Sequence, residues 1–174
     1  MTPDTALGMR SLPMRDAILF WDAYEAAARE GGEFEAAVRD LCVNDLYYLM
    51  VRACKREDML HPWIYARCRE VESDPNGYLD LWAREHYKST ICTFGLNIQR
   101  ILKNPEVTIG IFSHTRPIAK AFIRQIMREL EGNQILIGCF PEILWGSKIK
   151  DAPKWSEDEG IIVQRKSNPN EATI

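Results

Sequence analysis

Lys88, Ser89 and Thr90 are the residues whose types and spacing most clearly indicate chemistry. They follow a polar loop, residues 82–87, and open a run whose apolar positions have helical spacing: Ile91, Phe94, Ile98 and Leu102. The start of a helix offers unpaired N–H groups and the positive end of the helix dipole to an anion. A lysine there can reach the outer phosphates of a nucleotide, and a serine hydroxyl can bind Mg²⁺. The pattern therefore predicts a phosphate-binding P-loop; in the alternative, these three residues only cap and start a helix.

Two positions of this loop differ from the usual P-loop pattern G-x-x-x-x-G-K-[ST]. The glycine positions hold Trp82 and Tyr87. A left-handed backbone costs a residue with a Cβ roughly 1–2 kcal/mol, so we expect the loop to be strained or to follow a wider path. Arg84, four residues before Lys88, can supply part of the anion stabilisation that is lost with the glycines.

The segment W-A-R-E-H-Y-K-S-T, at 82–90, resembles the deviant P-loop of the large terminase subunits of tailed bacteriophages, which has an arginine at the position of Arg84. Later segments are also similar to that family: residues 108–120, 154–163 and 168–174. The resemblance covers about residues 60–174. It implies an ATPase domain that uses ATP and Mg²⁺ to drive DNA packaging into procapsids, as a molecular motor.

The resemblance also assigns roles to individual residues. Lys88 and Arg84 would act on the phosphates, Ser89 would bind Mg²⁺, and Thr90 would support it. The remaining contacts to ATP would come from three other loop residues, Glu85, His86 and Tyr87. Trp63 lies in a segment similar to the one that holds adenine in the family, so we expect it to stack on the base; the alternative is a position in the core between helix and sheet.

The partners implied by the resemblance are double-stranded DNA, the portal protein, the small terminase subunit and further copies of the chain in a ring. The implied location is the cytoplasm of the bacterial host. No run of about eighteen apolar residues is present, so no membrane partner is expected. The five cysteines are widely spaced and fit free thiols, and the three histidines are too scattered to indicate a zinc site.

The expected fold class is α/β, a P-loop NTPase-type parallel sheet flanked by helices and preceded by a helical N-terminal segment. Residues 1–75 are expected to form the helical, lid-like segment, and residues 76–174 the first part of the ATPase core. The predicted helices of the first part span residues 16–30, 33–57 and 62–72. The predicted strands of the second part span residues 78–82, 107–112, 161–163 and 172–174.

P-loop hydrolases also need a strand that ends in acids, which hold Mg²⁺ and orient water. Residues 107–112 are followed by Ser113-His114, and residues 161–163 by Gln164-Arg165. We therefore expect the catalytic acid beyond Ile174, in a longer protein whose nuclease domain is also absent from this sequence. We expect the 174-residue chain to show almost no ATP hydrolysis by itself.

The charge of the chain is unevenly distributed. The net charge is −3, yet residues 84–128 contain eight Lys and Arg against two Asp and Glu. Four of these cations repeat every fourth residue along a predicted helix: Arg116, Lys120, Arg124 and Arg128. They are candidates for contacting DNA phosphates or an acidic face of another subunit, and the alternative is a solvated face. Two further functions stay open: a helicase-like P-loop ATPase, and a non-hydrolysing DNA- or partner-binding module with a degenerate loop.

Overall fold

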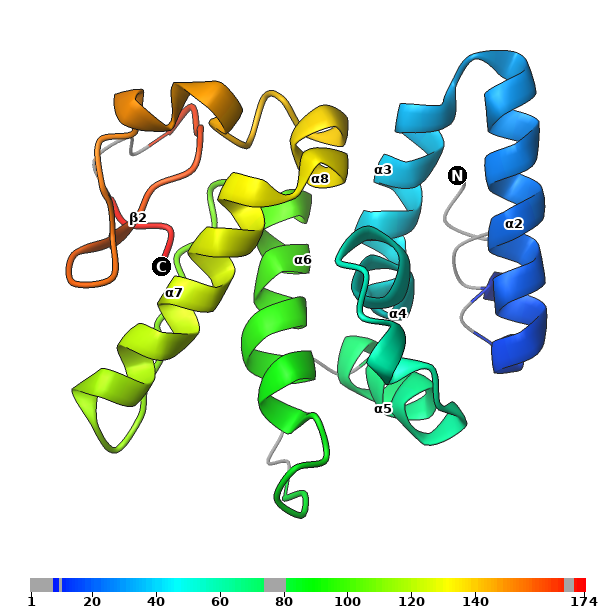
Figure 1. Cartoon of the computed structure of the whole chain (residues 1–174), viewed down its shortest axis with the longest axis horizontal. Helices are drawn as coiled ribbons and strands as arrows, with labels where there is room; N and C mark the ends of the chain where they lie inside the picture. Colours follow the sequence, from blue (N-terminus) through cyan, green and yellow to red (C-terminus); the bar gives the residue numbers. More distant parts are fainter. Residues whose placement is uncertain (1–7, 10, 74–80, 168–170) are drawn as a thin grey trace. The chain divides into compact units, whose positions relative to one another are not determined.

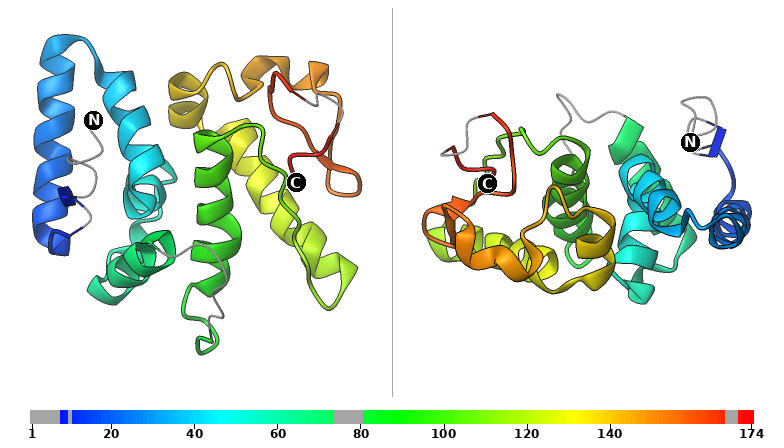
Figure 2. Two further views of the ribbon diagram at one scale, coloured as in Figure 1. Left: turned by 180° about the vertical axis from the view of Figure 1, so that it is seen from behind. Right: turned by 90° about the horizontal axis from the view of Figure 1, so that it is seen from above.

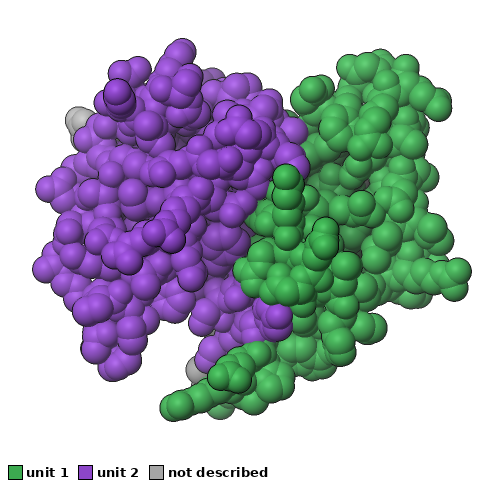
Figure 3. Space-filling model, in the orientation of Figure 1, with its two compact units in different colours: residues 1–86 green, residues 87–174 purple. Residues whose placement is uncertain are grey.

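The computed structural model describes residues 8–9, 11–73, 81–167 and 171–174. The chain divides into two compact units, Met1–His86 and Tyr87–Ile174 (Figure 3). The boundary predicted from the sequence, between residues 75 and 76, lies outside the described residues. Within the described parts of the chain, no helix has both the length and the apolar character needed to cross a lipid bilayer.

The described secondary structure of the first unit is helical (Figure 1). Its elements are α2 (Met14–Gly31), α3 (Phe34–Asn44), α4 (Leu46–Tyr48), the π-helix η1 (Leu49–Ala53), the 3-10 helix η2 (Glu57–Met59) and α5 (Pro62–Ser73). The predicted stop after the first helix is confirmed, because Gly32 adopts φ 73° and its N–H returns to the carbonyls of Ala28 and Arg29.

The long helix predicted over residues 33–57 is interrupted at Asp45. This residue has an extended backbone, with φ −140° and ψ 101°, and its side chain accepts a hydrogen bond from the Tyr48 N–H. An aspartate can cap a new helix in this way, which competes with continuing the old one. The sequence pattern predicted helical structure on both sides of Asp45 but missed the interruption.

The core of the first unit is built around aromatic side chains. Trp21 and Tyr47 are fully buried, and Tyr48 is nearly so. The Trp21 ring meets Tyr48 edge to face, with centroids 5.3 Å apart, and Tyr47 meets Tyr65 in the same way at 5.1 Å. The two consecutive tyrosines, Tyr47 and Tyr48, are thus central to the core of the first unit.

The second unit also contains several helices. They are the π-helix η3 (Ser89–Gly95), α6 (Leu96–Lys103), α7 (Arg116–Gly132), α8 (Gln134–Cys139) and the 3-10 helix η4 (Gly146–Asp151). η3 continues directly into α6, and α7 packs against η3 and α8 (Figure 2). The predicted apolar stripe is confirmed as core: Ile91, Phe94, Ile98 and Leu102 are all buried.

The predicted α/β fold with a parallel P-loop sheet is wrong. The described strands are β1 (Trp155–Ser156) and β2 (Gly160–Ile161), which pair antiparallel, with Trp155 opposite Ile161 and Ser156 opposite Gly160. Two short antiparallel strands form a hairpin, whereas a parallel sheet needs strands buried on both faces and joined by crossover helices.

The segment 107–112 shows why the strand prediction failed. It donates one backbone hydrogen bond to a distant segment, from the Ile109 N–H to the Thr173 carbonyl, 2.9 Å. Its Phe112 side chain is 95% exposed, so the segment has neither the paired ladder nor the two covered faces of a central strand. Most of the first predicted strand, residues 78–80, lies outside the described residues.

Candidate functional site

The loop before Lys88 has an unusual backbone. Glu85 and Tyr87 adopt positive φ angles of 64° and 61°, and Lys55 is the other non-glycine residue of the described chain that does so. Tyr87 stands where the P-loop pattern has its second glycine. Of the two paths expected for this loop, strained or wide, the structure has the strained one at Tyr87.

This strain has a chemical consequence. Each left-handed residue with a Cβ costs roughly 1–2 kcal/mol, and such costs concentrate at binding sites. Lys88 follows Tyr87 with right-handed angles, φ −51° and ψ −54°. A left-handed residue next to a right-handed one turns successive N–H groups toward one side, which makes a concave site for an anion.

Lys88 stands at the start of the helix η3–α6, as predicted. The first turn is closed by a hydrogen bond from the Ile91 N–H to the Tyr87 carbonyl, 2.8 Å. No side chain caps the start of η3, so the N–H groups of Ser89 and Thr90 are available to a ligand. Lys88 and Ser89 are exposed, and Lys88 forms no ion pair with the residues that the structure describes.

The boundary between the two units falls inside this loop. Arg84, Glu85 and His86 belong to the first unit, and Tyr87 and Lys88, with the two hydroxyl residues after it, belong to the second. In the first unit, the His86 ring nitrogen Nδ1 lies 2.7 Å from the Arg84 carbonyl oxygen. This contact closes the turn around Glu85, one of the two residues with positive φ in the loop.

Trp63 lies beside the loop residues of its own unit. Its ring meets Trp82 at 5.4 Å and His86 at 5.7 Å, both edge to face, and the Arg67 guanidinium covers the Trp82 ring at 4.4 Å. Trp63 is 39% exposed, so it does not occupy the core position that was its alternative. Its stacking on a nucleotide base stays a prediction.

The cations of α7 have partners that the sequence did not reveal. The Asp158 carboxylate forms ion pairs with Arg116, at 2.9 Å, and with Lys120. The Glu157 carboxylate accepts a hydrogen bond from the Arg124 Nε at 2.6 Å. Both acids belong to the turn between β1 and β2. The Lys120 contact, followed by the Arg116 charge, lowers the pKa of Asp158. Arg128 forms no ion pair with any residue described.

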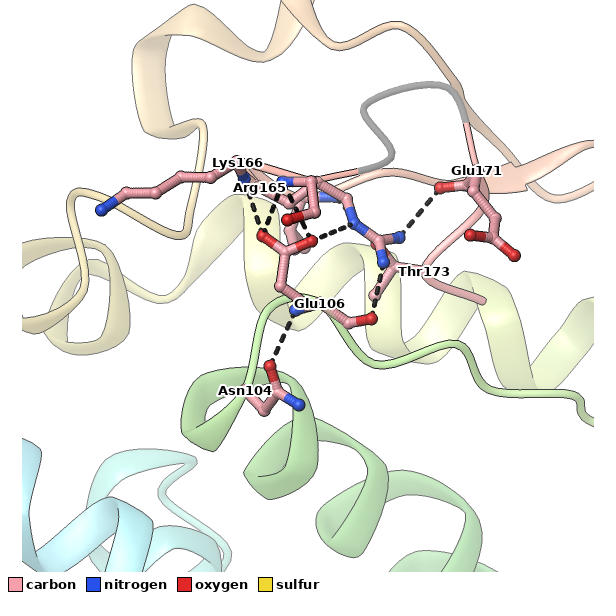
Figure 4. Close-up of polar contacts among 8 residues, drawn as sticks. Asn104, Glu106, Arg165, Lys166, Glu171 and Thr173 are labelled. Atoms are coloured by element: carbon pink, nitrogen blue, oxygen red, sulfur yellow. Dashed lines mark hydrogen bonds and ion pairs between the residues drawn. The ribbon is translucent and has the colours of Figure 1, made fainter.

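Glu106 forms a second polar cluster that sequence reasoning missed (Figure 4). Its carboxylate accepts the backbone N–H groups of Lys166 and Ser167, at 2.7 and 3.1 Å, and faces the Arg165 guanidinium at 3.4 Å. Arg165 also donates to the Glu106 and Glu171 carbonyls, at 2.7 and 2.9 Å. The N–H of Ser167, then that of Lys166 and the arginine, lower the pKa of Glu106. Because the Glu106 carboxylate already accepts the hydrogen bonds of these donors, the cluster stabilises the fold and does not form a ligand site.

The described part of the chain contains no group of three or more His, Cys, Asp or Glu residues arranged to hold a metal ion. The role of Ser89 as a Mg²⁺ ligand stays a prediction. No family model matches the chain, and neither a curated protein nor a solved structure is significantly similar to it.

Proposed function

We propose that the loop ending in Lys88 binds the phosphates of ATP. The observation that carries the proposal is the left-handed backbone of Tyr87 directly before an uncapped helix start. Strain at this point turns N–H groups toward a common side, and the lysine adds a full positive charge next to them. The proposal depends on this local geometry and requires no parallel sheet.

The residues divide the work by their chemistry. Lys88 contacts the outer phosphates, Ser89 ligates Mg²⁺ with Thr90 in support, and Arg84 adds a second cation.

The wider role that we propose is that of an ATP-driven DNA-packaging motor, like the large terminase subunits that the loop resembles. Its partners would be double-stranded DNA, a portal protein, a small terminase subunit and further copies of the chain, in the cytoplasm of a bacterial host. The support for this role is the residue pattern at 82–90.

The test of ATP binding compares nucleotides that differ in their phosphates. Calorimetric titration with ATP and AMP, each with Mg²⁺, should show clearly tighter binding of ATP, because the proposed contacts are with the outer phosphates. Equal affinities would mean that the loop does not recognise phosphate, whatever the base contributes.

A second candidate is a DNA- or partner-binding module that does not hydrolyse nucleotide. The observation in its favour is the row of cations on α7. Such a module would bind a DNA duplex without any response to ATP. Titration of DNA in the presence and absence of ATP and Mg²⁺ separates it from the first candidate.

A further inference from the structure

The hairpin β1–β2 runs along α7 in the opposite direction. The Trp155 indole N–H donates to Glu131, near the end of α7. Glu157 pairs with Arg124, and Asp158 pairs with Lys120 and Arg116, at the start of the helix. As the chain proceeds through the hairpin, its partners lie progressively nearer the start of the helix. The acidic turn therefore pairs with Arg116, Lys120 and Arg124, and Arg128 is the cation of the row that it does not pair with.

These ion pairs can open without disturbing the core. The side chains of Asp158 and Arg116 are 52% and 75% exposed. Exposed ion pairs contribute little stability, because water solvates each charge when the pair separates and salt screens the attraction. The apolar side of α7 is held independently, by the buried Ile126 and Leu130.

We propose that the acidic turn of residues 157–158 is an internal competitor for DNA, which occupies the cations of α7 until a DNA duplex displaces it. The cations form a row with a step of four residues, about 6 Å along a helix. Successive phosphates along one DNA strand rise about 3.4 Å along the axis and also wind around it, so neighbouring phosphates lie roughly 7 Å apart, a similar spacing. An extended row suits a linear polyanion better than a single phosphate group, which needs converging donors.

The position of Arg116, the first cation of the row, is a further reason to expect competition between the acidic turn and DNA. Arg116 lies at the beginning of α7, where the helix dipole disfavours a positive charge. An anion at this point, whether Asp158 or a DNA phosphate, relieves the repulsion. The two anions therefore compete for the same place, and this competition requires no nucleotide at Lys88.

The test is DNA binding by a chain whose turn has lost its charges. The variant Glu157→Gln/Asp158→Asn should bind a random-sequence duplex about 5- to 25-fold more tightly than the wild type does at low salt. The plot of log affinity against log salt should become steeper by roughly 1–2. Fluorescence anisotropy of a labelled duplex measures both quantities.

Two controls separate release of the cations from a mere change in net charge. Asp151→Asn/Glu159→Gln removes the same charge from exposed acids that form no ion pair with α7 in the described chain, and it should leave DNA binding nearly unchanged. In an Arg116→Gln/Lys120→Gln/Arg124→Gln background, which removes every cation that pairs with the turn, neutralising the turn should produce no gain.

An equal gain in the control, or no gain in the turn variant, would overturn the proposal. Self-association of the turn variant without tighter DNA binding would also overturn it, and would instead identify an acidic face of a second copy as the partner of α7. Thermal unfolding of each variant confirms that the exposed substitutions leave the fold intact.

Discussion

The Arg69 guanidinium donates a hydrogen bond to the Asp45 Oδ2 atom over 2.7 Å, and the Asp45 side chain is completely buried. The same oxygen accepts the Trp21 indole N–H at 3.0 Å, while the other carboxylate oxygen caps α4. One carboxylate thus joins α2, the start of α4 and α5. A buried charge is tolerated when its partners compensate it in this way.

Loss of this carboxylate should destabilise the first unit strongly. Asp45→Ala removes the close partner of the Arg69 charge, which keeps only the longer contact with Glu72 at 3.6 Å, and it leaves the Trp21 donor unsatisfied. The free energy of unfolding should therefore fall by about 3–5 kcal/mol. Urea denaturation followed by circular dichroism measures this change. Asp22→Ala is the matched control, because its pair with Arg52 is exposed and should contribute about 0–1 kcal/mol. Similar losses in the two variants would contradict the role of Asp45.

Replacement of Gly160 by any residue with a side chain should destabilise the fold. Its φ angle is 90°, and an added Cβ would lie 2.0 Å from the Ile174 carbonyl oxygen. The backbone of Ile161 is bonded to Ile174 at 3.0 Å, so the clash cannot be avoided without breaking this contact. Gly160→Ala should lower the free energy of unfolding by about 2–4 kcal/mol.

Gly138→Ala is the control for this substitution. It lies within α8 with open space around it, and alanine in a helix should be neutral or stabilising by up to about 1 kcal/mol. If both alanine variants unfold at the same denaturant concentration as the wild type, the close approach at Gly160 is not a feature of the folded chain.

Glu106 should make the second unit sensitive to acid. Its folded pKa lies below the ordinary glutamate value, so its contribution to stability is complete above about pH 4.3 and disappears as the pH falls through the lower folded pKa. Glu106→Gln should therefore be less stable than wild type near neutrality, and the difference should shrink below about pH 4. Urea midpoints measured across this range give the comparison.

Glu159→Gln serves as the reference, because Glu159 is exposed and pairs with no cation in the described residues. Its stability difference from the wild type near neutrality should be small, because no ion pair is lost. A constant difference for Glu106→Gln across the whole pH range would show that its carboxylate is not preferentially ionised in the folded state.

Much of the helical structure follows from local sequence. The signals for the end of the first helix near residue 30 and for the helix with Ile91, Phe94, Ile98 and Leu102 act within a few residues, and both predictions are confirmed. The interruption at Asp45 was missed because its capping bond competes with an equally plausible continuous helix.

The strand predictions failed for a different reason. Residues 107–112 have the β-branched composition of a strand, but strand formation depends on partners far away in the sequence. Long-range polar contacts were invisible for the same reason: 59 positions separate Glu106 from Arg165, and 42 separate Arg116 from Asp158. At the candidate site, the pattern predicted either strain or a wider path for the loop, and nothing in it indicated the positive φ of Glu85.

The left-handed backbone of Tyr87 should be required for ATP binding. Tyr87→Gly can adopt the same φ without strain, so it should keep the wild-type affinity or improve it. Tyr87→Val should weaken ATP binding about 5- to 30-fold, because a β-branched residue strongly disfavours this conformation. Calorimetric titration of both variants decides the point; equal affinities would contradict a role for this backbone geometry.

The most direct test of the account is ATP binding by Lys88→Ala, compared with Lys103→Ala. Lys103 is an exposed lysine in the last turn of the same continuous helix, so it controls for the loss of one positive charge. Removal of a charge-assisted contact to phosphate should cost about 2–3 kcal/mol, which is roughly a 30- to 150-fold loss of affinity. The account predicts this loss for Lys88→Ala and wild-type affinity for Lys103→Ala in titration with ATP and Mg²⁺. Unchanged ATP affinity in Lys88→Ala would contradict phosphate binding at this loop.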